Sequence, residues 1–252
     1  MSLPILMYHS VSRPERPDLR PAGYWLSPKE FSAHLGALRT AGAEGMTLEE
    51  LASPGRSGAE LPRSAVIITF DDGYLNNLRE ALPILVECGF KGVFFVTAGL
   101  LGNRHRLAAA DLIELRRAGM EVGSHGMTHR LYAGLSRAQL LCELGDSRKL
   151  LSDVLGEPVD FFSLPRGYLP PALPDLARES GYRGMCTSRP GRNGLGSDPF
   201  RWRRFPVRSG DGPEEVTSLL RGYGLGYASI WMREKMRSLL RVRYRMRRFR
   251  PA

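Results

Sequence analysis

Four segments of this chain with helical character end at a glycine, and a short apolar run follows each of them. The four glycines are Gly42, Gly89, Gly119 and Gly181. Glycine is common just after a helix, because it adopts the left-handed conformation without a steric penalty from Cβ. Helices that alternate with short strands in this way are typical of βα units. The pattern therefore predicts a mainly parallel sheet covered by helices.

Extending the pattern along the chain gives six or seven βα units. We expect strands over residues 5–11, 65–70, 91–97, 120–124, 159–163, 182–187 and 203–208. We expect helices over residues 28–40, 76–88, 109–118, 137–155, 171–180 and 213–221, a short helix capped at Thr47, and a loop over 188–199. This number of units in one domain indicates an α/β barrel or an incomplete barrel.

The composition is that of an ordinary globular protein, with 42% hydrophobic and 25% charged residues among 252. No apolar stretch is long enough to predict a membrane-spanning helix, and the first residues lack the features of a signal peptide. The three cysteines are far apart and have no CxxC spacing. They indicate free thiols in a reducing compartment rather than a disulfide framework or a cysteine zinc site. We therefore expect a cytoplasmic protein.

The net charge of +10 is concentrated at the C-terminus. Residues 1–200 carry 22 basic and 22 acidic side chains, whereas residues 201–252 carry 14 basic and 4 acidic ones. We expect a barrel domain over residues 1–222 and a basic amphipathic tail over 223–252. Residues 230–250 suit a helix lying on an anionic membrane surface, which would place the protein at the inner face of the membrane. A packed helix with solvated cationic side chains is an equal alternative, and nucleic acid is disfavoured because the body has no nucleic-acid motif.

Polar side chains stand where several predicted strands end, and the active site of a parallel barrel is built there. Asp71 and Asp72 end the strand 65–70, and His125 ends the strand 120–124 with His129 close behind. His9 lies in the first strand. Arg166 follows the strand 159–163.

These residue types suit a catalytic zinc site, which takes three protein ligands and leaves a position for water. His125 and His129 are four residues apart, so one turn of chain can bring both imidazoles to the same side. One carboxylate of the Asp71–Asp72 pair would complete the ligand set, and the other would be a general base. Either motif alone has a simpler interpretation, an acidic turn for the Asp pair or a surface pair for the histidines.

The run Thr69-Phe70-Asp71-Asp72-Gly73 and the run His125-Gly126-Met127-Thr128-His129 resemble two motifs of the polysaccharide deacetylases, the NodB homology domain of carbohydrate esterase family 4. The opening Leu6–Val11 is also similar to members of that family. The resemblance implies a distorted seven-stranded (β/α) barrel. It implies Asp71 as the general base, and Asp72, His125 and His129 as ligands of a divalent metal, usually zinc. The metal-bound water would attack the acetyl group of an acetylated sugar.

The sequence departs from the family pattern in three places. The family arginine that pairs with the base usually precedes a proline, whereas Arg166 follows Pro165. The family's Leu-x-His motif, which supplies the general acid, is absent because no histidine follows His129. We expect His9 to replace it. Alternatively, Asp71 shuttles the proton in both directions, or the protein is a weak or silent enzyme. The family also has a motif with an aspartate near a tryptophan. Trp202 is present here, but no aspartate clearly matches that motif.

The function that we expect is a metal-dependent hydrolase that removes N- or O-linked acetyl groups. Its substrate would be a sugar of a polysaccharide, a glycolipid or a lipid-linked glycan precursor of the cell envelope or an exopolysaccharide. Asp71, His9 and Arg166 are the candidate catalytic residues, and Tyr74, Tyr168 and Trp202 are the candidate substrate contacts. The alternative is a catalytically silent glycan-binding protein.

Overall fold

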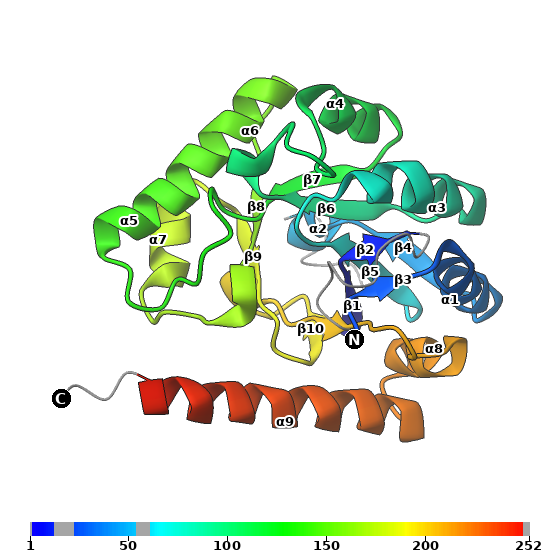
Figure 1. Ribbon diagram of the computed structural model, residues 1–252. Coiled ribbons are helices and arrows are strands. Elements are labelled where there is room, and N and C mark those ends of the chain that lie inside the picture. Colours follow the sequence, from blue (N-terminus) through cyan, green and yellow to red (C-terminus); the bar gives the residue numbers. More distant parts are fainter. Residues whose placement is uncertain (1, 13–22, 54–60, 249–252) are drawn as a thin grey trace.

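The computed structural model describes residues 2–12, 23–53 and 61–248, with the backbone alone for residues 237–248. In this part of the chain, seven parallel strands curl around a common interior (Figure 1). They are β1 (Ser2–Tyr8), β5 (Ala65–Phe70), β6 (Gly92–Val96), β7 (Glu121–Ser124), β8 (Phe161–Ser163), β9 (Gly184–Cys186) and β11 (Phe205–Pro206). The expected fold class, a distorted seven-stranded (β/α) barrel, is confirmed.

The two ends of the curled sheet are joined by the segment around Trp202 and β11. Trp202 bridges to Cys186 of β9 in parallel. Directly after it, Phe205 and Pro206 of β11 pair with Leu6 and Met7 of β1. The strand predicted over 203–208 is therefore present as β11. It is shorter than predicted, because only Phe205 and Pro206 pair with β1.

Every residue of β5 is buried, since one face of the sheet packs against helices and the other lines the interior. Val66, Ile68 and Phe70 belong to the larger core under the helices. Ala65 and Ile67 belong to the smaller interior core, which also contains Trp202. Two buried faces explain why this strand reads as a continuous apolar run rather than an alternating one.

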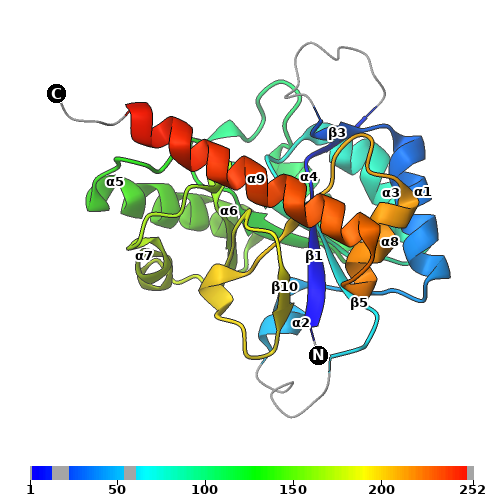
Figure 2. The same ribbon diagram turned by 90° about the horizontal axis from the view of Figure 1, so that it is seen from below.

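The helices cover the outside of the sheet (Figures 1 and 2). They are α1 (Pro28–Thr40), α2 (Leu48–Ala52), α3 (Leu82–Cys88), α4 (Ala109–Arg117), α5 (Arg137–Leu141), α6 (Ser147–Leu155), α7 (Leu173–Glu179), α8 (Pro213–Arg221) and α9 (Leu225–Arg248). Ser27 and Glu30 form the capping box that the sequence predicts at the start of α1. The predicted helices 76–88 and 137–155 each contain a π-helical turn, at Asn77–Ala81 and Cys142–Asp146.

Three strands lie outside the predicted set. β4 (Glu44–Met46) pairs with the first half of β5, and β10 (Arg192–Gly194) pairs antiparallel with β1 inside the predicted loop 188–199. The first predicted strand is divided into β1 and β2 (Ser10–Val11), and β2 pairs with β3 (Trp25–Leu26). These short strands depend on neighbours that are distant in sequence, so a local apolar pattern does not reveal them.

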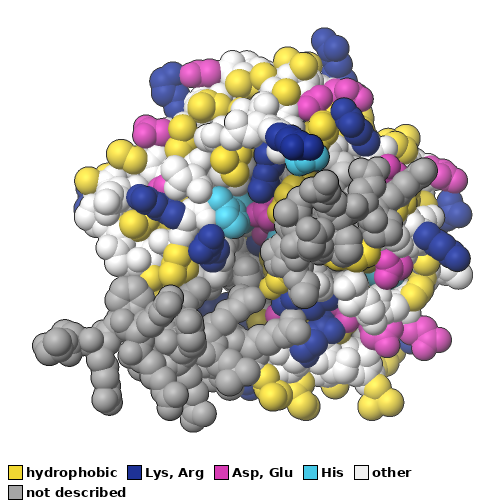
Figure 3. Space-filling model, viewed as in Figure 1, with side chains coloured by type: hydrophobic (Ala, Val, Ile, Leu, Met, Phe, Trp, Pro, Cys, Tyr) yellow, Lys and Arg dark blue, Asp and Glu magenta, His cyan; other side chains and the backbone are white. Residues whose placement is uncertain are grey.

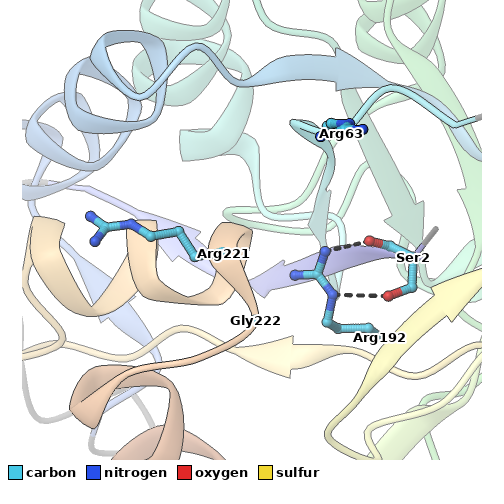
Figure 4. Close-up of a pocket in the computed structure, with 5 residues that line it drawn as sticks. All are labelled: Ser2, Arg63, Arg192, Arg221 and Gly222. Carbon is cyan, nitrogen blue, oxygen red and sulfur yellow. Dashed lines mark hydrogen bonds between the residues drawn. The ribbon is translucent and has the colours of Figure 1, made fainter.

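A hollow of about 480 Å³ lies at the amino-terminal edge of the sheet, lined by Ser2, Arg63, Arg192, Arg221 and Gly222 (Figure 4). Arg192 donates hydrogen bonds to the carbonyl oxygens of Leu219 and Leu220, in the last turn of α8, and to Ser2. Its guanidinium therefore caps α8 and fastens the start of β1. This hollow is at the opposite end of the strands from Asp71 and His125.

The interior packing gives a stability prediction at Gly184. A Cβ at this position would lie 2.7 Å from Cζ3 of Trp202 and 3.1 Å from Cδ1 of Phe161. We expect Gly184→Ala to lower the free energy of unfolding by about 1–3 kcal/mol through overpacking, measured by urea denaturation.

The matched control is Gly36→Ala in α1, where a Cβ would have no other atom within 4 Å. Alanine is the better helix former, so this change should raise the free energy of unfolding by up to about 1 kcal/mol. Equal effects of the two substitutions would contradict the assigned packing.

Candidate active site

The alternation of side chains along the strands brings one set of polar groups into the barrel interior. Ile67 and Thr69 of β5 face the interior, and Asp71 continues this series just beyond the strand end. Tyr8 of β1 is paired with Phe70, and the Asp71 backbone N–H donates to the Tyr8 carbonyl at 3.0 Å. Because side chains alternate with a period of two, His9 follows β1 on the same side as Asp71.

Asp71 is held by a buried arginine, Arg204. The two guanidinium nitrogens of Arg204 donate to the two carboxylate oxygens of Asp71, both at 2.7 Å. Ser163 Oγ lies 3.2 Å from each oxygen and accepts a bond from Arg204 at 2.7 Å. Burial alone would raise the pKa of Asp71, but the charge and hydrogen bonds of Arg204 outweigh it and hold this pKa below its ordinary value.

The arginine predicted for this place was Arg166, and the structure assigns the bidentate pairing to Arg204 instead. Arg166 is exposed, in the turn Pro165–Gly167 after β8, with a φ of 55°. Arg204 precedes β11 and is fully buried. The sequence analysis missed it because 133 positions separate it from Asp71. Its alternation with Trp202, which also faces the interior, is the signal that could have found it.

Asp72, His125 and His129 form a group whose ligand atoms all lie within 4.8 Å of one another. Asp72 Oδ1 is 3.3 Å from His125 Nε2 and 2.9 Å from His129 Nε2. Although both nitrogens are this close, the oxygen is buried and has no hydrogen-bond partner of acceptable geometry. Three lone-pair-bearing atoms that point at one space without bonding each other fit a cation between them.

The backbone conformation orients the side chains of these three residues. Asp72 and His129 have positive φ values of 76° and 57°, which non-glycine residues seldom adopt. The turn at Asp72 directs its side chain away from that of Asp71. His125 Nδ1 donates to the Ser163 carbonyl at 2.9 Å, which orients the ring so that Nε2 faces Asp72.

Glu143 supports the loop between the two histidines, and the sequence analysis did not identify it. It is buried in the π-helical turn after α5, and its carboxylate accepts the backbone N–H groups of Met127 and Thr128, both at 3.0 Å. Thr128 Oγ1 and the Tyr132 hydroxyl also donate to it. The signal in the sequence was its place on the apolar face of the predicted helix 137–155, three residues after Leu140 and directly before Leu144.

His9 lies against the ring of Tyr24, with the ring centroids 4.4 Å apart. Its Nδ1 is buried without a hydrogen-bond partner. Burial lowers the pKa of His9, while the nearby charges of Asp72 and Asp71 act in the opposite direction. The structure therefore brings His9 to the two carboxylates, where the sequence analysis expected it.

The three aromatic residues predicted to contact substrate have different positions. Tyr74 is half-buried beside the site; burial and the charge of Asp72 raise its pKa, and Arg106 stacks on its ring at 4.1 Å. Tyr168 is half-buried after the turn that follows β8. Trp202 is only 2% exposed, because its ring fills the interior between Gly184 and Phe161. The prediction that Trp202 contacts a sugar is wrong.

The mouth of the site opens near the middle of one face of the molecule. Figure 3 shows histidine and acidic side chains there, with basic side chains around them. This position follows from the carboxyl-terminal ends of the strands, which meet on that face. The arrangement combines a converged ligand set, an ionised buried carboxylate and an imidazole in one space.

Comparisons with known proteins identify the family of this chain. The family model for polysaccharide deacetylase matches residues 58–185. YxkH of Bacillus subtilis, which carries the name of a polysaccharide deacetylase, is 30% identical over 208 residues, covering 82% of this chain and 72% of that protein. The peptidoglycan-N-acetylglucosamine deacetylase of Bacillus cereus is 28% identical over 164 residues, covering 64% of this chain and 72% of that protein.

A solved structure has the same fold. The Streptococcus pyogenes deacetylase PplD, solved in complex with acetate, superposes with a TM-score of 0.81 at 22% identity, covering 87% of this chain and 98% of that one. Fold, sequence and the family match lead to one assignment. This chain belongs to the polysaccharide deacetylase family of carbohydrate-modifying hydrolases.

Proposed function

We propose that this protein hydrolyses the acetyl group of an N-acetylated sugar in a polysaccharide, a glycolipid or a lipid-linked glycan, with a divalent metal, most suitably zinc. The observation that carries the proposal is the convergence of Asp72, His125 and His129 beside the buried Asp71–Arg204 pair. The name of the Bacillus cereus relative supports an N-acetylated substrate. Hydrolysis of an O-acetyl group is the alternative that the same machinery allows.

Asp72, His125 and His129 would hold the metal. Two imidazoles and one carboxylate form a common ligand set of catalytic zinc. The bound metal would lower the pKa of a water molecule and polarise the acetyl carbonyl. The chain itself orients the ligands, through Ser163 on His125 and through Glu143 on the loop that carries His129.

Asp71 would accept the proton of the attacking water. Arg204 and Ser163 fix the orientation of its carboxylate and keep it ionised at neutral pH. A base held in one orientation needs no rearrangement before the proton transfer. The same two partners exclude water from the far side of the carboxylate.

His9 would deliver a proton to the leaving nitrogen. An amine is a poor leaving group unless it is protonated, so hydrolysis of an amide needs an acid. His9 and Asp71 follow neighbouring strands, and the proton that Asp71 accepts can pass to His9 and then to the amine. Because burial lowers the pKa of His9, the resting imidazole is neutral and is ready to take up this proton.

We expect the purified protein to hold about one equivalent of divalent metal. A chelator should abolish acetate release from N-acetylglucosamine oligosaccharides, and zinc should restore it. His129→Gln should lose the metal, measured by elemental analysis, and should also lose the increase in melting temperature that zinc gives the native protein. Native protein that is active without metal would contradict this site.

We expect Asp71→Asn to lower kcat/KM by about 10²–10⁴, because it removes the base, while the metal content stays native. Arg204→Lys should cause a smaller loss, since an ammonium group cannot make the bidentate bond. Asp160→Asn is the matched control, because Asp160 pairs with Arg148 and Arg183 at the surface. Native activity in Asp71→Asn would exclude Asp71 as the base.

We expect His9→Gln to lower acetate release from the N-acetylated oligosaccharide by about 10²–10⁴. Hydrolysis of 4-nitrophenyl acetate should change little, since its leaving group needs no protonation, whereas Asp71→Asn should lose both reactions. The exposed His105 provides the control His105→Gln, which should keep both. If His9→Gln retains full amide hydrolysis, then Asp71 carries the proton in both directions.

A further inference from the structure

The helix α9 presents two unlike faces in the part where its side chains are described. Ile230 is fully buried, and Glu234, one turn later, is 6% exposed. Leu225, Met232 and Met236 are 91%, 56% and 57% exposed. Their spacings of seven and four residues place these three on one stripe of the helix, on the side away from Ile230 and Glu234.

The inner face fastens α9 to the barrel domain. Arg208, just after β11, donates to both carboxylate oxygens of Glu234, at 2.8 and 3.2 Å. Arg233 forms a second bidentate pair with Asp211. Trp231 packs against the main core beside Ile230. Because this face is fixed by buried ion pairs and apolar packing, the outward stripe has a fixed direction and is not free to fold inward.

The segment that begins with the stripe is strongly basic in sequence. Residues 230–252 contain nine Lys and Arg residues and one acid, Glu234, which Arg208 already neutralises. Tyr223, which precedes the helix, is 69% exposed and extends the apolar surface. Figure 2 shows α9 lying across the underside of the molecule, so that its outer side is a boundary of the protein. Among the described residues, no helix is long and apolar enough to cross a bilayer.

We propose that the outward stripe of α9, formed by Leu225, Met232 and Met236, docks onto an anionic membrane surface. Apolar side chains flanked by cationic ones suit the boundary between headgroups and acyl chains, where the apolar groups are buried and the charges meet anionic lipids. The exposed Lys235 adds a cation beside the stripe, and its ammonium lies 4.3 Å from the centre of the Trp231 ring. A second copy of the chain would carry the same positive charge, which disfavours it as the occupant.

The docked helix would lie close to the active site. Arg208, which holds Glu234 of α9, also donates to the Tyr24 hydroxyl at 2.7 Å and stacks on its ring. Tyr24 in turn packs on His9. Two side chains therefore separate the inner face of α9 from the imidazole at the site, so docking would bring the mouth of the barrel near the lipid surface.

The test is co-sedimentation of the full chain with vesicles of phosphatidylcholine, with and without phosphatidylglycerol. We expect binding to the vesicles that contain phosphatidylglycerol, weakened by salt. The double variant Met232→Glu with Met236→Glu should weaken binding by about tenfold or more, because it removes apolar contacts and adds repulsion from the anionic lipid. Val86→Glu is the matched control, since Val86 lies on α3 with the same exposure of 57%.

Acetate release from a soluble acetylated oligosaccharide should be the same in all of these proteins, which verifies that the variants fold. Absence of vesicle binding, equal binding to both kinds of vesicle, or native binding by the double variant would overturn the proposal. A dimer of the native protein that the double variant abolishes, measured by analytical ultracentrifugation without vesicles, would overturn it in favour of a second copy. Loss of binding in the double variant alone, with a monomeric native protein, would support it.

Discussion

Two adjacent carboxylates at the end of a buried strand are the constraint on which the site depends. Asp71 and Asp72 are 2% and 8% exposed, and ions in the interior cost several kcal/mol each unless they are paired. Arg204 offsets the charge of Asp71, and the imidazoles of His125 and His129 lie beside the carboxylate of Asp72. Because the positive φ of Asp72 separates the two side chains, one dipeptide supplies two different environments. That difference allows neighbouring residues to have different chemical roles.

The Arg204–Asp71 pair also connects the site to the closure of the barrel. Arg204 stands between Trp202, which bridges to β9, and β11, which pairs with β1. Removing one partner of a buried pair costs about 3–5 kcal/mol, because the other charge is left uncompensated. The ends of the sheet and the carboxylate are therefore stabilised by the same ion pair. A barrel that failed to close would lose the orientation of Asp71 as well.

Features with a local origin were predictable from the sequence, and those that depend on distant contacts were not. The bounds of α1, β5 and α8 are as predicted, since a capping box, an apolar run and a terminal glycine define them within a few residues. Asp71, His125 and His9 were found because strand ends are visible in the pattern. Arg204 was missed because barrel closure selects it, and Trp202 was misplaced because the same closure turns its ring inward.

The segment after Trp202 also links the site to the C-terminal helix. Arg204 binds the carboxylate of Asp71 inside the barrel, and Arg208, four residues later, binds Glu234 of α9 and the hydroxyl of Tyr24. Between them, β11 is fixed to β1, which leads directly to His9. A displacement of α9 would therefore act on Tyr24 and His9 through Arg208, whereas Asp71 and its partner are held by the sheet. In this arrangement the imidazole of His9 is connected to α9 through Tyr24 and Arg208, whereas the carboxylate of Asp71 is held by Arg204 inside the barrel.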